Sequence, residues 1–355
     1  MVDTYSLKIG GLRINELFEE SLDSPKDYVQ VIREYLTPFF ETLSDAIPEK
    51  LSQCIVSGNE IQTIASMCNA TNSLDFSIME RTAFTKMYKK AKEKGTEAIS
   101  MEYDIPQEEV EVLLPSLIVL NRLLKYTVND SILLSNVLLS DAVMFEMLFP
   151  KEASFVVKAY EEFTLQSATS IAERFGRDLD HISRVSSVAL EIYDKMKKLH
   201  GYKLRERTLL QVSAILQDIG KYVNVKNHAL LSYNTITNLD IVGINDHERL
   251  IIATVCYYHN GNIPSMDSPI YNQLSQEDRV MVSKLAAILQ ISNAINTSHS
   301  PKFEQVNVNM KNGKLNIYLT TLKNINLEKW AFIAKSKLFR EVYGLNATII
   351  KRGVL

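Results

Sequence analysis

The chain has 355 residues, which predicts two or three domains, and 46% of the residues are apolar, enough to form hydrophobic cores. A net charge of −3 argues against a general binder of nucleic acid or membrane surfaces, although a local basic patch can still hold a polyanion. The three cysteines lie far apart, the longest apolar run, Val112–Leu124, is too short to cross a bilayer, and no signal-peptide pattern opens the chain. We therefore expect a soluble cytoplasmic protein with no nucleic-acid or membrane partner.

Residues 1–150 alternate short β-rich runs with helical periodicity, which is typical of an α/β layer structure. The letters SQCIVSG followed by NEIQTIASM predict a strand, a turn and a helix. Farther along, Pro106 and the acidic residues after it predict the start of a helix that reaches Tyr126, and DSILLSNV predicts a second strand. Strands and helices in this order predict a parallel sheet.

Residues 151–302 carry no strand signals. Their apolar residues recur at helical spacing, as in Ile182, Val185, Val188, Ala189 and Ile192. We therefore predict an all-helical domain over this range.

Residues 303–355 predict a small ββαβ unit. The letters QVNVNMKNGKLNIYLTT form two alternating runs around Asn312-Gly313, which is a strong hairpin signal. A helix near residues 327–343 and the strand-like letters NATIIKR complete the unit.

The first candidate site is the turn Ser57-Gly58-Asn59, where a buried strand meets a helix. Backbone amides and the serine hydroxyl at such a turn can cradle a phosphate against the positive end of the helix. An ordinary capping turn carries the same letters, so both interpretations stay open. The loop in LLSDAVMFEM has the same strand-to-helix form, with Asp141 as the expected cap.

The second candidate site surrounds Gln217-Asp218, in the letters AILQDIGKYVNVKNH. His181 lies upstream in the chain, and His228 and His259 lie downstream. A helical bundle builds a metal centre for phosphoester chemistry when successive helices each direct one His or Asp inward. A single histidine on an apolar face usually belongs to the core, but four ordered positions in one helical domain favour the geometry of a metal site.

The chemistry of this second site is weaker than its spacing. Gln217 offers a neutral amide where a metal phosphohydrolase would carry an imidazole, and Asn293 offers a neutral carbonyl where it would carry a carboxylate. Because an anionic ligand is lost, a two-metal clamp is not expected. The predicted degenerate site holds at most one ion, through His181, Asp218, His228 and His259.

Three arginines flank His181 in the sequence, namely Arg174, Arg177 and Arg184. A guanidinium group matches phosphate oxygens in a bidentate manner, so these side chains are candidates for phosphate binding. The same arginines can equally cap helices, and the sequence does not separate the two roles.

Six segments resemble, in order and across nearly the whole chain, the exopolyphosphatase and guanosine pentaphosphate phosphohydrolase (Ppx/GppA) family. They are YSLKIGGLRINELF, CIVSGNEIQTIA, LLPSLIVLNRLL, DHISRVSSVALEIYDKM, AILQDIGKYVNVKNHALLSYNTI and DIVGINDHERLIIATVCYYHNG. Together they are far more specific than any one of them.

The resemblance implies an α/β plus all-α fold in three parts. These are one actin-like (ribonuclease H-like) α/β lobe at 1–150, a helical HD-like domain with a degenerate metal site at 151–302, and a small C-terminal ββαβ unit at 303–355. The implied activity is phosphoanhydride hydrolysis, either of inorganic polyphosphate or of guanosine pentaphosphate to the tetraphosphate. The implied cofactor is Mg²⁺ or Mn²⁺.

The chain departs from the family pattern in two places. Its first letters, VDTYSLKIGG, resemble the strand that follows the Gly-Gly-Gly-Ser phosphate loop of the family, so we expect the N-terminal lobe, with its catalytic carboxylate, to be missing. Whether Met1 is a native start or a truncation stays open, and no catalytic residue is assigned. Ser140-Asp141-Ala142 lacks the arginine and the glycine of the family, and alanine restricts positive φ and the close approach of a phosphate.

Three functions compete at this point. The first is an exopolyphosphatase-like or guanosine pentaphosphatase-like protein that is inactive alone, with the missing N-terminal lobe or a homodimer partner supplied separately. The second is an independent HD-domain metal phosphohydrolase. The third is a non-catalytic regulatory protein that binds polyphosphate or guanosine penta- or tetraphosphate.

Overall fold

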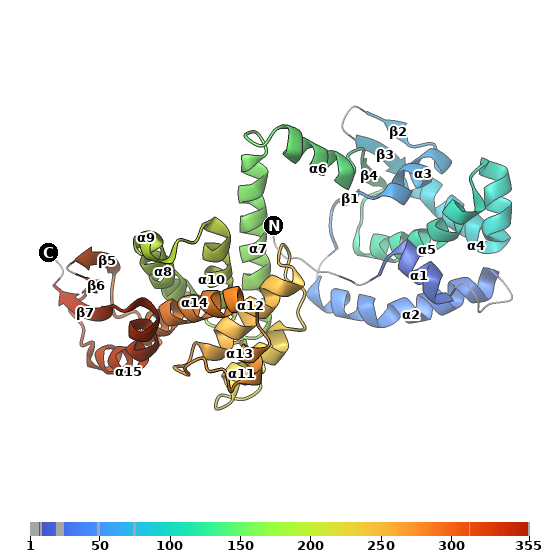
Figure 1. Cartoon of the computed structure of the whole chain (residues 1–355). Coiled ribbons are helices and arrows are strands. Elements are labelled where there is room, and N and C mark those ends of the chain that lie inside the picture. Colours follow the sequence, from blue (N-terminus) through green and yellow to red (C-terminus); the bar gives the residue numbers. More distant parts are fainter. Residues whose placement is uncertain are drawn as a thin grey trace. The chain divides into compact units, whose positions relative to one another are not determined.

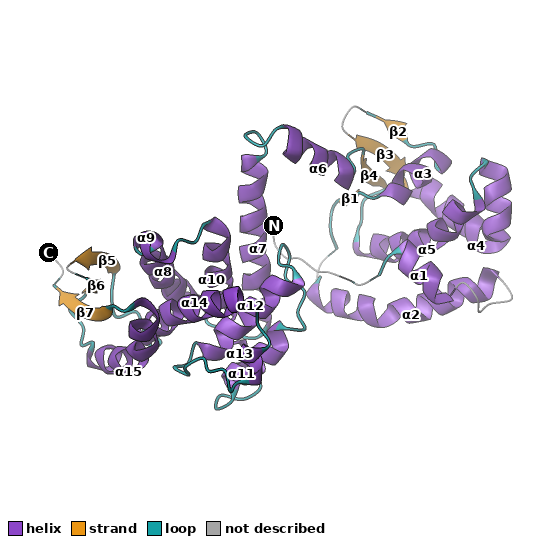
Figure 2. Cartoon of the chain, viewed as in Figure 1, coloured by secondary structure: helices purple, strands orange, loops and turns teal. Residues whose placement is uncertain are grey.

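The computed structural model describes residues 7, 9–18, 25–47, 50–73, 76–311 and 313–353. They form two compact units that divide between Ser154 and Phe155, here called the first and the second unit. Each unit is mostly helical and carries one small sheet (Figures 1 and 2). Most of the segment predicted as a strand at 2–11, and Asn312 of the predicted turn, lie outside the described residues. No helix in the described ranges has both the length and the hydropathy of a membrane span.

In the first unit, four short strands form a mixed sheet in the order β1-β4-β3-β2. The strands are β1 (Cys54–Val56), β2 (Thr71–Asn72), β3 (Phe76–Glu80) and β4 (Ser131–Ser135). β1 and β4 pair in parallel, as the sequence predicts, whereas β3 runs antiparallel to both β4 and β2. The sequence pattern did not predict the antiparallel β2–β3 pair, because β2 has only two residues and both are exposed.

The helices of the first unit supply most of its core. They are α1 (Gly11–Phe18), α2 (Pro25–Ala46), α3 (Asn59–Met67), α4 (Arg81–Tyr103), α5 (Gln107–Leu123), the 3-10 turn η1 (Leu124–Tyr126) and α6 (Leu139–Leu148). Apolar side chains from α2, α4 and α5 are buried together with Ile132 and Leu134 of β4. The helix predicted from Pro106 to Tyr126 is confirmed as α5 followed by η1.

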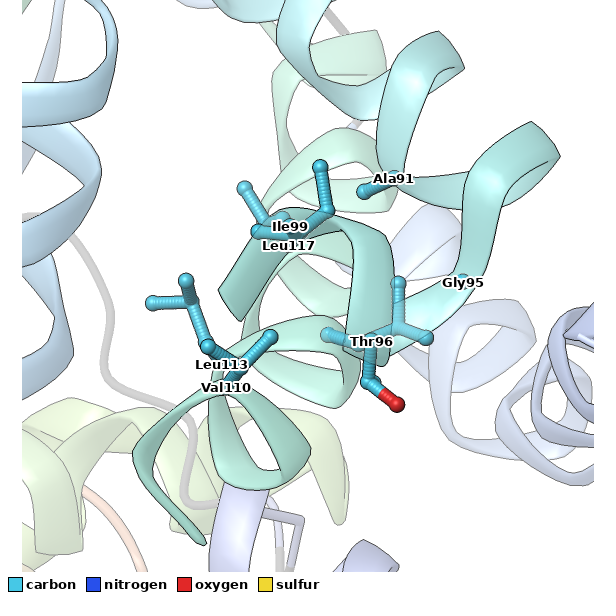
Figure 3. Close-up of a pocket in the computed structure, with 8 residues that line it drawn as sticks. Ala91, Gly95, Thr96, Ile99, Val110, Leu113 and Leu117 are labelled. Atoms are coloured by element: carbon cyan, nitrogen blue, oxygen red, sulfur yellow. The ribbon is translucent and has the colours of Figure 1, made fainter. Parts of the chain in front are cut away.

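Helix α4 changes direction at Gly95, whose φ of 78° lies in the region that favours glycine. A cavity of about 10 Å³ lies beside this kink, lined mainly by apolar side chains of α4 and α5 (Figure 3). A space of this size holds about one water molecule at most, and a water needs two or more polar partners. The cavity is therefore a packing gap rather than a ligand site.

The second unit begins with a bundle of helices. They are α7 (Ser154–Arg174), α8 (Leu179–Lys195), α9 (Lys197–His200), α10 (Leu204–Leu216), the 3-10 turn η2 (Ile219–Tyr222), α11 (His228–Ile236), α12 (Asp246–Tyr258), α13 (Pro269–Asn272) and α14 (Gln276–Ile295). The absence of strands from this stretch is the result that its helical spacing predicts.

Three strands and one helix follow the bundle. They are β5 (Gln305–Lys311), β6 (Lys314–Thr320), α15 (Asn326–Tyr343) and β7 (Asn346–Arg352). β5 and β6 form the predicted antiparallel hairpin, with Lys311 opposite Lys314, and β7 pairs in parallel with β6. Helix α15 lies along α14 (Figure 1), and the apolar residues of both segments belong to one hydrophobic core.

Candidate functional site

Asp218 lies between the end of α10 and the start of η2. The turn approaches α11 closely, since a Cβ atom on residue Gly220 would come within 2.2 Å of the carbonyl oxygen of His228. Ser232 holds this contact, because its hydroxyl accepts from the Gly220 amide at 2.9 Å and donates to the Gln217 carbonyl at 2.8 Å. Glycine at position 220 therefore allows the backbone to bring Asp218 next to His228.

Three side chains converge here, those of Asp218, His228 and His259. Asp218 Oδ1 lies 3.6 Å from His228 Nε2 and 3.3 Å from His259 Nε2, and the two imidazole nitrogens are 3.3 Å apart. All three residues are buried. Ligand atoms bound at about 2.1 Å to one ion lie roughly 3.0–3.4 Å from one another, so this spacing fits a single metal ion.

The hydrogen bonds of the two imidazoles direct their lone pairs into the cluster. His228 Nδ1 lies 2.7 Å from the carbonyl oxygen of Val225, and His259 Nδ1 contacts the carbonyl oxygen of Cys256. A carbonyl can only accept, so each Nδ1 carries the proton of the neutral ring and each Nε2 keeps its lone pair. Two lone pairs and a carboxylate oxygen this close together need a cation among them, either a proton or a divalent ion.

The other oxygen of Asp218 has a different partner. Lys221 Nζ lies 2.7 Å from Asp218 Oδ2. Burial alone would raise the pKa of the Asp218 carboxyl, but a proton on His259 Nε2, as the cation of the cluster, and the Lys221 ammonium outweigh burial and hold that pKa well below its usual range. The carboxylate therefore stays ionised, with Oδ1 facing the imidazoles and Oδ2 facing the ammonium.

His181 lies beside this cluster. Its Nε2 is 3.9 Å from Asp218 Oδ2, and its Nδ1 is 2.9 Å from the amide nitrogen of Asn296. Its ring stacks on that of His299, with 3.9 Å between the ring centroids. Burial, assisted by His299, lowers the pKa of His181 to about 4, so the ring is neutral at pH 7.

Gln217 and Asn293, the two positions where the sequence predicts weakened ligands, are both buried. Neither polar atom of the Gln217 side chain has a hydrogen-bond partner in the described part of the chain. A buried amide without partners costs free energy, and such groups in native proteins call for a specific explanation. This unpartnered amide directly precedes Asp218 in the chain.

The three arginines predicted to bind phosphate have different surroundings. Arg177 donates to the carbonyl oxygens of Phe175 and Asp218, which places it against the backbone of the cluster. Arg184 is half-buried, and its Nε has no hydrogen-bond partner among the described residues. Arg174 is exposed at the end of α7.

Four side chains at the site were missed by sequence reasoning, namely Lys221, Asn296, His299 and Lys335. Lys221 could have been found, because it follows Asp218 by three positions, which is the spacing of a local ion pair. Lys335 could not, because it comes from α15, far along the chain. Its ammonium is within electrostatic range of both Asp218 and Lys221.

The Ser57-Gly58-Asn59 turn lies in the first unit, between β1 and α3. Gly58 precedes α3 with a φ of 154°, in the region that favours glycine. The Ser57 hydroxyl donates to the carbonyl oxygen of Val137 at 3.3 Å, and Glu60 places a carboxylate in the first turn of the helix. That carboxylate opposes the attraction of the helix end for a phosphate.

The second loop of the first unit, Ser140-Asp141-Ala142, forms the first turn of α6. Asp141 Oδ2 accepts a hydrogen bond from the amide of Leu138 at 2.8 Å. The N-cap is Leu138 rather than Asp141, which is the third residue of the helix and whose carboxylate accepts from the N-cap backbone.

Residues 165–338 match the family profile described as Ppx/GppA phosphatase, domain III. The matched segment contains Asp218, His228 and His259, with Lys221 beside them. Residues 165–338 belong to the Ppx/GppA phosphatase family. The family match agrees with the resemblance that the sequence motifs carry.

Among solved structures, an exopolyphosphatase from Cytophaga hutchinsonii is similar to this chain. The two sequences are 18% identical over the matched region, which covers 41% of this chain and 49% of that chain, and the TM-score is 0.36. The match thus spans about half the length of the exopolyphosphatase chain.

Proposed function

We propose that this Ppx/GppA family member binds a phosphoanhydride ligand, either inorganic polyphosphate or a guanosine penta- or tetraphosphate. In this proposal the second unit holds a phosphate group of the ligand beside a single divalent ion. The family match supports the class of ligand. The observation that carries the proposal is the convergence of Asp218 Oδ1 with the Nε2 atoms of His228 and His259.

The donor set favours Mn²⁺ over Mg²⁺. Two imidazole nitrogens and one carboxylate oxygen suit a transition metal, whereas Mg²⁺ prefers oxygen ligands and retains several waters. Asp218, His228 and His259 would hold the ion, while Lys221 keeps the carboxylate oriented through Oδ2. A bound divalent ion supplies charge that attracts and polarises a phosphoryl oxygen.

The described residues support binding more strongly than hydrolysis. Among them, Asp218, His228 and His259 form the one group of three side chains that could hold a metal ion. A clamp of two ions on the attacking and leaving oxygens needs more ligands than this group provides, and the neighbouring Gln217 is a neutral amide. We therefore expect the purified chain to bind polyphosphate without appreciable release of phosphate.

The test combines a turnover assay with a binding assay. Phosphate release from polyphosphate and from guanosine pentaphosphate is measured with malachite green, in Mg²⁺ and in Mn²⁺. Binding of fluorescently labelled polyphosphate is measured in parallel, and its affinity should fall as salt is added. Robust phosphate release would contradict the proposal, and so would the absence of binding at low salt.

A second function, a metal phosphohydrolase in the second unit, is favoured by the lone-pair geometry of His228 and His259. The substitution Asp218→Ala separates the two functions if release is observed. If Asp218→Ala abolishes phosphate release, hydrolysis occurs at this cluster. If phosphate release is unchanged in this variant, hydrolysis occurs elsewhere. The matched control is Asp246→Ala, because that side chain is exposed at the start of α12.

A further inference from the structure

Lys335 is a half-buried lysine without a countercharge in contact with it. Its stem passes close to the loop after His259, since a Cβ atom on residue Gly261 would lie 3.8 Å from Lys335 Cγ. In the described part of the chain, no carboxylate pairs with its ammonium, whereas Lys337, two positions later, contacts Glu341. Buried charges in proteins are normally paired, so the missing partner of Lys335 points to a ligand.

Two carboxylates that act on the cluster, Asp218 and Asp178, already have hydrogen-bond partners. Asp218 Oδ2 contacts Lys221 at 2.7 Å, and Asp218 Oδ1 faces the two imidazoles. Asp178 Oδ1 accepts from the backbone amides of Asp180 and His181 at 2.9 and 3.2 Å, which caps α8. Both oxygens of Asp218 thus have partners, and the hydrogen bonds to Asp178 Oδ1 hold that carboxylate in the cap of α8.

Arg184 is a second cation near the cluster with no carboxylate paired to it among the described residues. Its Nε is buried and has no hydrogen-bond partner among the described residues. Its charge acts on His299, the ring that stacks on His181 and that also lies in the field of Lys221 and of the carboxylates Asp218 and Asp178. Lys221, Lys335 and Arg184 thus carry more charge here than Asp218 and Asp178, and a divalent ion on Asp218 would increase the positive excess.

We propose that Lys335, Lys221 and Arg184 form a binding site for a phosphate oxyanion beside Asp218. The inference rests on the proposed function and deepens it, because it assigns the phosphate contacts to named side chains. A tetrahedral oxyanion offers several acceptors, and hydrogen bonds from ammonium and guanidinium groups to such acceptors are the strong, charge-assisted kind. Helix α15 then contributes directly to ligand binding through Lys335.

The test is calorimetric titration of the full chain with inorganic tripolyphosphate and, separately, with guanosine tetraphosphate. The variants are Lys335→Met, which keeps the stem and removes the charge, and Lys335→Arg, which keeps the charge. The matched control is Lys337→Met, an exposed position on the same helix with its own carboxylate partner. Titrations in EDTA and in Mn²⁺ separate the contribution of the side chains from that of an ion.

Lys335→Met should weaken binding of both ligands by about tenfold or more, whereas Lys335→Arg should retain most of the affinity and Lys337→Met all of it. Without ligand, Lys335→Met should melt at the same or a higher temperature, because it removes an unpaired, partly buried charge. Equal affinity of wild type and Lys335→Met would overturn the Lys335 site and leave the proposed function standing. Failure of wild type to bind either ligand would overturn both.

Discussion

The carboxylate of Asp218 divides its oxygens between two sets of partners, and in the proposed function this division would let a metal ion and a lysine share one residue. Lys221 occupies Oδ2, while Oδ1 lies with the imidazole nitrogens of His228 and His259. An ammonium on one oxygen lowers the charge that a metal ion meets at the other. We therefore expect a single ion to bind more weakly here than in a site where the carboxylate is unpaired.

The double substitution Gln217→His with Asn293→Asp should raise the affinity for Mn²⁺. It supplies the imidazole and the negative charge that the cluster lacks, and both positions are already buried. Calorimetry on wild type and the double variant measures the change, with Asn234→Asp on the exposed face of α11 as the control for added charge. If the double variant gains nothing over the control, the cavity has lost its shape as well as its ligands.

His200 should make the stability of the second unit depend on pH. Its Nε2 contacts the carbonyl oxygen of Tyr193 at 2.8 Å, and its Nδ1 accepts from the amide of Tyr202 at 3.0 Å. Burial lowers the pKa of His200 below that of an exposed histidine. The neutral ring thus contributes stability above the unfolded pKa of about 6.5, and this contribution is lost as pH falls toward the folded pKa.

His200→Gln should flatten this dependence, because glutamine does not titrate. The difference in slope between wild type and variant should be at most about 1.4 kcal/mol per pH unit below pH 6.5. Denaturant unfolding at several values between pH 7 and pH 5 provides the measurement. Parallel curves for the two proteins would show that His200 does not titrate with unfolding.

At the scale of elements, a helix or strand could be predicted wherever the residues that determine it lie in one short segment. The hairpin at β5 and β6 follows from its alternation and its turn, and α5 follows from its proline and acidic first turn. The β2–β3 pair was not predicted, since two exposed residues carry no alternation. The kink of α4 at Gly95 was not predicted either, because the sequence does not show where a glycine takes positive φ.

The packing of η2 against α11 gives a test at this scale. Gly220→Ala would place a methyl group 2.2 Å from the carbonyl oxygen of His228 and 2.5 Å from the amide nitrogen of Ser232. Because both neighbours are backbone, the elements must separate, and the variant should lose at least about 2 kcal/mol of unfolding free energy. It should also lose affinity for Mn²⁺, since the separation moves His228 away from Asp218.

The matched control is Gly353→Ala, where an added Cβ atom meets nothing within 4 Å. Denaturant unfolding of both variants beside wild type provides the comparison. If Gly220→Ala is as stable as Gly353→Ala, then η2 and α11 tolerate separation, and the glycine does not explain how Asp218 reaches His228.

At the scale of the whole molecule, the net negative charge of the chain disfavours binding of the anionic ligand that we propose. The chain carries a net charge of −3, yet the proposed ligand is a polyanion. Binding must therefore depend on the local field of Lys221, Lys335 and Arg184 rather than on overall charge. The family assignment locates this local field inside domain III, which the match places at residues 165–338.

The sequence alone predicts Asp218, His228 and His259 for one site, together with His181, which lies beside the cluster, but it does not predict the cations around them. Asp218, His228 and His259 follow one another along successive elements of the second unit, so their order is visible in the letters. Lys335 enters from α15 through tertiary packing, and nothing in its neighbourhood along the chain indicates that contact. Whether a buried cation lacks a paired carboxylate depends on how the side chains pack. It can therefore be recognised only when the burial and the partners of each side chain are known.

The most direct test of the metal centre is to locate Mn²⁺ itself by anomalous diffraction from crystals of the chain grown with the ion. We expect an anomalous peak among Asp218 Oδ1, His228 Nε2 and His259 Nε2, at bonding distance from all three, with Lys221 still on Asp218 Oδ2. The absence of a peak there at saturating Mn²⁺, or peaks confined to exposed carboxylates, would contradict it.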